Sequence, residues 1–97
     1  MITISMKPYA PIISDHEMGQ KILSEIKNAL AKDDVIIDMD GVVSMATYCA
    51  KQIFGSLYST LGPANFFDRI KIANASDDLK VIIRMGIAAK LKEKGEL

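Results

Sequence analysis

Cysteine and histidine are nearly missing from this sequence: Cys49 and His16 are the single copies of each among 97 residues. One cysteine cannot close a disulfide within the chain, and one cysteine with one histidine cannot form the clusters that hold zinc. We therefore expect no disulfide framework and no metal site. So little use of cysteine fits a reducing compartment, and we expect a cytoplasmic protein.

An excess of charge is also missing, because twelve Lys/Arg residues balance twelve Asp/Glu residues. Nucleic-acid binding draws much of its affinity from basic side chains that neutralise phosphates, so we expect no nucleic-acid partner. No apolar run reaches the roughly 20 residues that span a bilayer, and the start of the chain lacks the basic segment and apolar run of a signal peptide. We expect neither membrane insertion nor secretion.

What is present is the composition of one globular domain over residues 1–97, with 49% hydrophobic and 25% charged residues. Residues 2–6 and 70–74 alternate apolar and polar side chains, as strands do. Residues 35–37 are β-branched without alternation, which is typical of a strand covered on both faces. We expect 35–37 to be the central strand of a parallel sheet with helices on each side.

The first helix is predicted over about residues 15–31, where apolar side chains recur at helical spacing. Ser14 lies three residues before Glu17, the spacing of a capping box in which both side chains bind backbone amides of the first turn. The sequence therefore predicts a helix that starts at this pair, after a turn marked by Pro8 and Pro11.

The second helix is predicted over residues 47–61, where apolar residues recur at i, i+3, i+4, i+7 and i+8, and Gly62 followed by proline ends it. Gly55 lies inside this helix at a cost of about 1 kcal/mol relative to alanine, so we expect a neighbouring element to approach it closely. Phe66 and Phe67 follow, and we expect both to close the edge of the core.

The last helix is predicted to start at Ser76, whose hydroxyl can cap it, and to run to about Leu91, while the polar tail 92–97 is expected to fray. It carries a second apolar stripe opposite its core-facing one, formed by Val81, Met85, Ala88 and Ala89. A helix that is apolar on two sides needs two partners, so these residues are interface candidates, for another protein or for a homodimer.

Asp38 and Asp40 follow the central strand, two residues apart, where ligands bind in open α/β sheets. A pair of carboxylates there could hold Mg²⁺ for phosphoryl transfer, with Asp38 as the nucleophile of a haloacid-dehalogenase-type phosphatase. The lysine and further acidic pair of such an enzyme are not found on successive strands. We favour a strand that ends in solvent, with Gly41 in the turn, and keep the enzyme as an alternative.

Residues 35–62 combine an apolar strand, an acidic end, a short loop that closes with Ser44, and a helix that opens Ala46-Thr47-Tyr48. This resembles the STAS fold of bacterial anti-anti-sigma factors, in which a strand leads through a loop into a helix that opens Asp-Ser-Ser-Gly-Leu and the second serine accepts a phosphate. It is closer still to the STAS-like family of unknown function, in which Ser or Thr followed by an aromatic starts the helix and a Phe-Gly pair, here Phe54-Gly55, comes later.

The resemblance implies a small α/β STAS-like sandwich: a mostly parallel sheet of three or four strands with helical crossovers, in the order βαβαβα. It implies a protein partner, either a kinase-like ATPase or an anti-sigma-like factor. Tyr48 takes the place of the phosphoacceptor serine, which leaves Thr47 and Ser44 as the other acceptors. A structural explanation for Thr47, as a helix cap worth about 1 kcal/mol, stays open.

We therefore expect a non-enzymatic, bacterial regulatory domain that binds its partner through Ser44, Thr47 and Tyr48. Catalytic residues and cofactors are not expected. Cys49 is expected to be a small buried hydrophobe rather than a nucleophile. The alternatives are the phosphoryl-transfer enzyme that uses Asp38 and Asp40, and a structural module that dimerises through the last helix.

Overall fold

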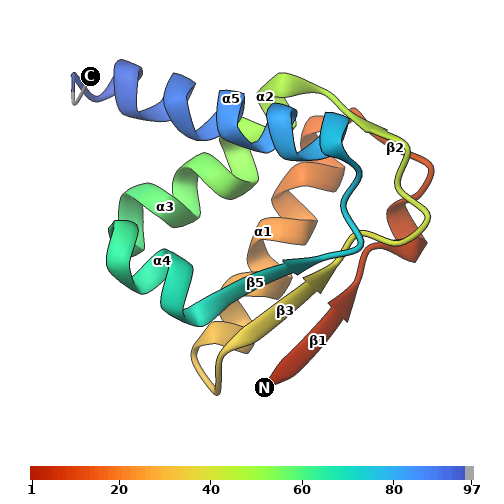
Figure 1. Ribbon diagram of the computed structural model, residues 1–97, viewed down its shortest axis with the longest axis horizontal. Coiled ribbons are helices and arrows are strands. Elements are labelled where there is room, and N and C mark those ends of the chain that lie inside the picture. Colours follow the sequence, from red (N-terminus) through yellow and green to blue (C-terminus); the bar gives the residue numbers. More distant parts are fainter. Residues whose placement is uncertain (96–97) are drawn as a thin grey trace.

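Three parallel strands form the main sheet, in the order β1-β3-β5 (Figure 1). The computed structural model describes residues 1–95, and in it β1 spans Ile2–Ser5, β3 Val35–Asp38 and β5 Ile70–Ala73. Ile2 pairs with Val35, and Val35 pairs with Ile70. The predicted parallel α/β sheet, with residues 35–37 in its central strand, is confirmed.

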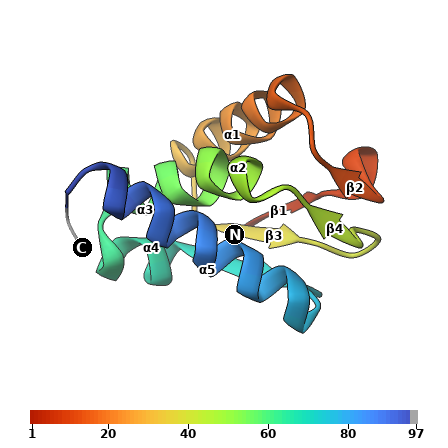
Figure 2. The same cartoon turned by 90° about the horizontal axis from the view of Figure 1, so that it is seen from above.

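The helices of the two crossovers pack against the face of this sheet on which Val35 and Ile37 are buried, and α5 packs mainly on α2, η2 and α3 (Figures 1 and 2). The helix bounds are α1 His16–Leu30, α2 Thr47–Ala50, a π-helical segment η2 Lys51–Gly55, α3 Ser56–Leu61, α4 Pro63–Arg69 and α5 Asp77–Glu93. Parallel crossovers are right-handed, and the strand order advances in one direction without reversal. Both crossovers must therefore place their helices on the same side.

The opposite face of the sheet is open, which corrects the prediction of a strand covered on both sides. Val35 and Ile37 are buried under the helices, but Ile36 is only partly buried. Its neighbours in the register on that face, Thr3 and Lys71, are exposed. A run of three β-branched residues does not reveal which face is covered, because the strand order decides that.

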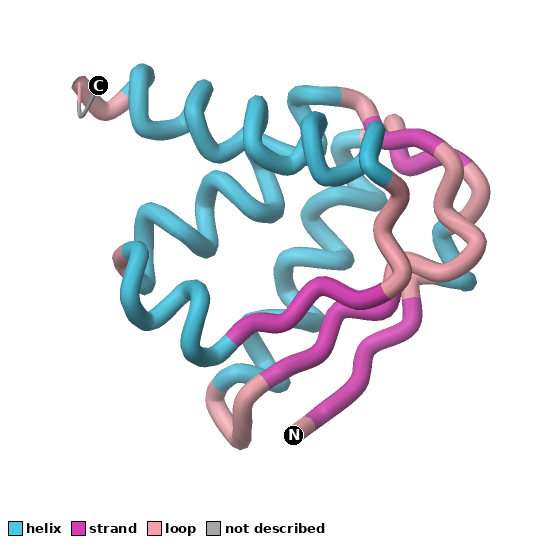
Figure 3. The backbone as a smooth tube through the Cα atoms, in the orientation of Figure 1, coloured by secondary structure: helices cyan, strands magenta, loops and turns pink. Residues whose placement is uncertain are grey.

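A second, smaller parallel sheet joins β2 (Ile12–Ile13) to β4 (Ser44–Met45), and the sequence patterns did not predict it (Figure 3). Ile13 and Met45 are buried, so the pair anchors two loops to the core. Two-residue strands are too short for a period to be detected. The turn marked by Pro8 and Pro11 is confirmed, with a 3-10 helix, η1, over Lys7–Tyr9.

Helix α1 covers the predicted range to within a residue at each end, but it is not capped by the predicted side chains. Its N-cap is Asp15, and no side-chain hydrogen bond closes the first turn. The capping box of Ser14 and Glu17 is therefore wrong. The helix depends instead on its buried face, which includes Ile22, Leu23 and Ile26.

The second helix runs unbroken over residues 47–61 as α2, η2 and α3, and helix α5 crosses it at close range. A Cβ added to Gly55 would lie 2.7 Å from the Cβ of Lys90, and one added to Gly86 would lie 2.5 Å from the carbonyl carbon of Ala50. Two glycines thus allow the helix backbones to approach, and the prediction of a close neighbour at Gly55 is confirmed.

After Gly62, which has a φ of 82°, the chain starts a further helix instead of a loop. Pro63 is the first residue of α4, a position where proline is favoured because its missing amide has no partner to lose. Phe66 is buried as predicted. Phe67 is 62% exposed, so the prediction that it closes the core is wrong.

Helix α5 begins as predicted, since the Ser76 Oγ accepts a hydrogen bond from the Leu79 amide at 3.2 Å. It continues to Glu93, whose carboxylate pairs with Lys51 and Lys90. The predicted fraying is therefore wrong for residues 92 and 93, and the end of that tail, residues 96–97, lies outside the described residues. Between residues 1 and 95, no helix has the length and apolar character to cross a membrane.

Candidate functional site

The loop that leaves β3 is held at both ends by backbone hydrogen bonds. The Met39 amide donates to the Ala73 carbonyl at 2.8 Å, and the Val42 amide donates to the Met39 carbonyl at 3.0 Å, with Gly41 at a φ of 90° between them. The Ala46 amide then donates to the Ile13 carbonyl at 2.8 Å. The predicted turn at Gly41 is confirmed, and the loop is fastened to β2 before the helix begins.

Three large apolar side chains are exposed on these joined segments. The exposed fractions are 53% for Ile12, 71% for Val43 and 54% for Tyr48. Ser44 is partly buried and Thr47 is exposed. We call these five residues, Ile12, Val43, Ser44, Thr47 and Tyr48, the β2–β4 surface. The structure brings the three predicted site residues into it and adds Ile12 and Val43, which sequence reasoning missed because it did not predict β2.

Thr47 does not serve as a helix cap. The N-cap of α2 is Ala46, which has no side-chain capping hydrogen bond, and Thr47 is the first helical residue. The structural explanation considered for this threonine is therefore wrong. Its hydroxyl lies on an exposed residue at the start of the helix, where another molecule can reach it.

Cys49 and Tyr48 are adjacent in the chain but lie in different surroundings. Cys49 is fully buried, as predicted, and its Sγ lies 3.7 Å from the Asp15 carbonyl oxygen. Burial raises the pKa of the Cys49 thiol, which keeps it protonated and unreactive at neutral pH. Loss of solvent, then the neighbouring Cys49 and the Asp15 carboxylate, raise the pKa of Tyr48, so its phenol stays neutral.

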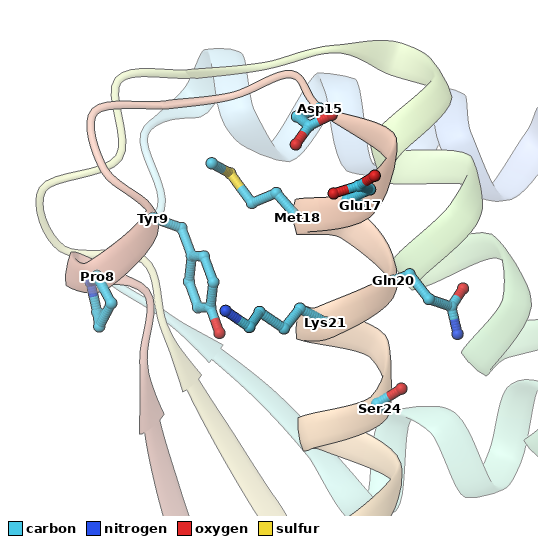
Figure 4. A pocket seen from close by; sticks show the side chains of 8 residues that line it. All are labelled: Pro8, Tyr9, Asp15, Glu17, Met18, Gln20, Lys21 and Ser24. Carbon is cyan, nitrogen blue, oxygen red and sulfur yellow. The ribbon is translucent and has the colours of Figure 1, made fainter.

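A groove of about 670 Å³ lies next to this surface, between η1 and the first turns of α1 (Figure 4). Pro8 and Tyr9 form one wall, and Met18 and Lys21 are among the residues of the other. The Tyr9 hydroxyl donates to the Glu25 Oε1 at 3.2 Å, and burial followed by that carboxylate raises the pKa of Tyr9.

Asp15 connects the groove to the β2–β4 surface. It lines the groove, and its carboxylate also acts on the Tyr48 phenol. Sequence reasoning missed this groove because η1 and α1 meet only in the tertiary structure.

Asp38 is engaged in closing the strand end. Its Oδ1 accepts from the Asn74 Nδ2 at 2.9 Å and from the Asp40 amide at 3.0 Å. These two hydrogen bonds, and then the Lys7 ammonium, hold the pKa of Asp38 below its usual value. Asp40 forms an ion pair with Lys7 at 3.4 Å. In the described part of the chain, no three His, Cys, Asp or Glu side chains are grouped so as to hold a metal ion.

The stripe predicted on α5 is largely exposed. Val81 and Met85 are about half exposed, Ala88 is exposed and Ala89 is partly buried. The opposite side of the helix, which includes Leu79, faces the core. The role of the stripe in a homodimer remains a prediction.

The arrangement of strand, loop and helix agrees with the result of the family comparison. Residues 18–80, about two thirds of the chain, match the family model described as a STAS-like domain of unknown function. No curated protein and no solved structure matches the chain.

Proposed function

Because the chain belongs to the family of STAS-like domains of unknown function, we propose that it is a non-enzymatic regulatory domain that binds a protein partner through the β2–β4 surface. The observation that supports this most is the exposure of Ile12 in β2, Val43 in the loop before β4 and Tyr48 in the first turn of α2, on segments fastened to the core. Apolar and aromatic side chains on a rigid support are typical anchors of protein interfaces.

The partner we propose is a kinase-like ATPase or an anti-sigma-like factor, as in the bacterial STAS domains that the sequence resembles. Thr47 is the preferred phosphoacceptor in this proposal. Ser44 is partly buried in β4, and a phosphate on Tyr48 would lie near the Asp15 carboxylate, which repels it. A phosphate on Thr47 would add about two negative charges to the β2–β4 surface and change its affinity.

The test is binding to a purified kinase-like ATPase or anti-sigma-like protein encoded beside this one, measured by biolayer interferometry. Tyr48→Ala and Val43→Ser should each weaken binding at least about tenfold, because each removes an exposed apolar anchor. Thr47→Glu, which imitates phosphothreonine, should also change the affinity. Val81→Ser is the matched control, since it removes an exposed valine from α5.

Unchanged binding by Tyr48→Ala and Val43→Ser would contradict the proposed surface. If Val81→Ser is the only variant that weakens binding, the interface lies on α5. Absence of any binding to both proteins would contradict the proposed partner class.

A further inference from the structure

A second apolar groove lies between α4, β5 and α5, and neither the sequence patterns nor the proposed function accounts for it. Its volume is about 190 Å³, and its apolar lining consists of Phe66, Phe67, Ile72, Ile83 and Ile87. This is below the roughly 300 Å³ at which small-molecule pockets begin, and it suits one or two protein side chains. We call it the Phe67 groove.

Phe67 is exposed yet held in place. Its ring lies edge-on to the Phe66 ring, with centroids 5.3 Å apart, and edge-on to the Tyr58 ring at 6.2 Å. Edge-to-face pairs of this kind contribute about 0.5–1.5 kcal/mol each beyond the area they bury. A fixed aromatic side chain loses little conformational entropy when a partner covers it, so the groove is organised before binding.

The rim of the Phe67 groove is positively charged. Lys80 and Arg84 line it from α5, four residues apart and so on one side of the helix. Lys80 and Arg84 form no ion pair within residues 1–95, and no carboxylate lines the groove there.

We propose that the Phe67 groove docks a short segment of a partner protein in which an apolar side chain lies between acidic residues. The apolar side chain would fill the groove, and the acidic residues would pair with Lys80 and Arg84. The charge pattern of the rim argues for this occupant over a basic or uncharged segment, because opposite charges attract and like charges oppose docking. This site stands apart from the β2–β4 surface and does not depend on its function.

The experiment uses three synthetic hexapeptides and the ¹⁵N-labelled full chain. The first peptide has a central Phe-Leu pair with two glutamates on each side, the second replaces the glutamates with lysines, and the third replaces Phe-Leu with two alanines. The acidic Phe-Leu peptide should shift amide signals of α4, β5 and the 80–87 part of α5. The other two should bind at least tenfold more weakly.

Variants separate the apolar part of the site from its charged part. Arg84→Glu and Phe67→Ser should each weaken binding of the acidic Phe-Leu peptide at least tenfold. Lys92→Glu, which changes an exposed lysine further along α5, should leave that binding unchanged. Arg84 is exposed, so Arg84→Glu keeps the fold even if Phe67→Ser does not. Equal binding of the lysine peptide, or shifts confined to the β2–β4 surface, would overturn the proposal. If the unmodified protein has the mass of a dimer in solution and Phe67→Ser has the mass of a monomer, the groove binds a second copy of this chain instead.

Discussion

Single side chains decide how the strand end should be understood. Asp38 and Asp40 look like a metal-binding pair in the sequence, but Asp38 bonds to Asn74 and to the Asp40 amide, while Asp40 pairs with Lys7. Each carboxylate thus has a structural partner on a neighbouring segment. Thr47 is the opposite case. The sequence allows its hydroxyl a structural role as a helix cap, but the N-cap of α2 is Ala46 and the Thr47 side chain makes no capping hydrogen bond.

The Asp38 carboxylate should stabilise the fold in a pH-dependent way. Its pKa is lowered in the folded protein, so its contribution is fully present above the unfolded value of about 3.9 and is lost as the pH falls through the folded value. Asp38→Asn should therefore lower the urea midpoint at pH 7, and the difference from the unmodified protein should shrink as the pH falls below about 4.

Asp68→Asn is the control for that measurement, because Asp68 is exposed and lies away from the strand end. A constant difference between Asp38→Asn and the unmodified protein from pH 7 to pH 2 would contradict the assigned role of the charge.

At the scale of elements, the crossing of α5 over the second helix is set by glycine. Gly86 lies against Ala50 and the start of η2, where even a methyl group would come too close to the backbone. The π-helical turn and the glycine occur at the same crossing. The stability of α5 therefore depends on backbone approach as well as on its apolar side chains.

Gly86→Ala should destabilise the protein although alanine is the better helix former. The propensity gain of about 1 kcal/mol is outweighed by overpacking, which costs about 1–3 kcal/mol when the neighbour is backbone. The added Cβ would lie 2.6 Å from the Lys51 amide nitrogen. The free energy of unfolding, measured by urea denaturation, should therefore fall.

Gly19→Ala is the matched control for this prediction. Its Cβ would meet only the end of the Gln52 side chain, at 2.1 Å from the Oε1, and that oxygen has no hydrogen-bond partner among the residues described. The Gln52 side chain can rotate away from the new methyl group, and it then loses its hydrogen bond to the His16 carbonyl. The free energy of unfolding of Gly19→Ala should therefore be close to that of the unmodified protein. A stabilising Gly86→Ala would show that the helices are further apart than the structure indicates.

At the scale of the whole molecule, the strand order β1-β3-β5 leaves one face of the sheet open and β1 at an edge. The Ile2 amide donates to the Asp34 carbonyl and the Met6 amide donates to the Asp38 carbonyl. Because the bonding side alternates along a strand, the Ile4 amide also points to β3, and the Thr3 and Ser5 amides point to the free edge.

Amide hydrogen exchange should show this alternation directly. Ile4 and Met6 should exchange slowly, with Ile37 of the central strand slower still, while Thr3 and Ser5 should exchange as fast as loop residues. The measurement is a series of ¹⁵N–¹H spectra after transfer to D₂O. Slow exchange at Thr3 and Ser5 would mean that another strand covers the edge in solution.

The sequence patterns predicted the long elements correctly and missed the shortest ones. Residues 15–31 and 47–61 carry enough helical repeats to be recognised, and both helices were predicted to within a residue or two. β2 and β4 have two residues each and offer no period, so Ile12 was missed as part of the candidate site. Ser44, Thr47 and Tyr48 were predicted as site residues from a local motif, which needs no tertiary information, and their role in binding stays a prediction.

By itself, the sequence determined the three main strands, the long helices and the strand-loop-helix motif around Thr47, because these depend on the spacing of side chains along one segment. Only the tertiary structure decided which sheet face is covered, which glycines support a helix crossing, and which exposed residues form the two surfaces. Those features join segments far apart in the chain, such as Pro11 with Val43 and Phe67 with Arg84. Their positions follow from the strand order and the packing of the whole molecule, and the spacing of side chains along one segment does not determine either of these.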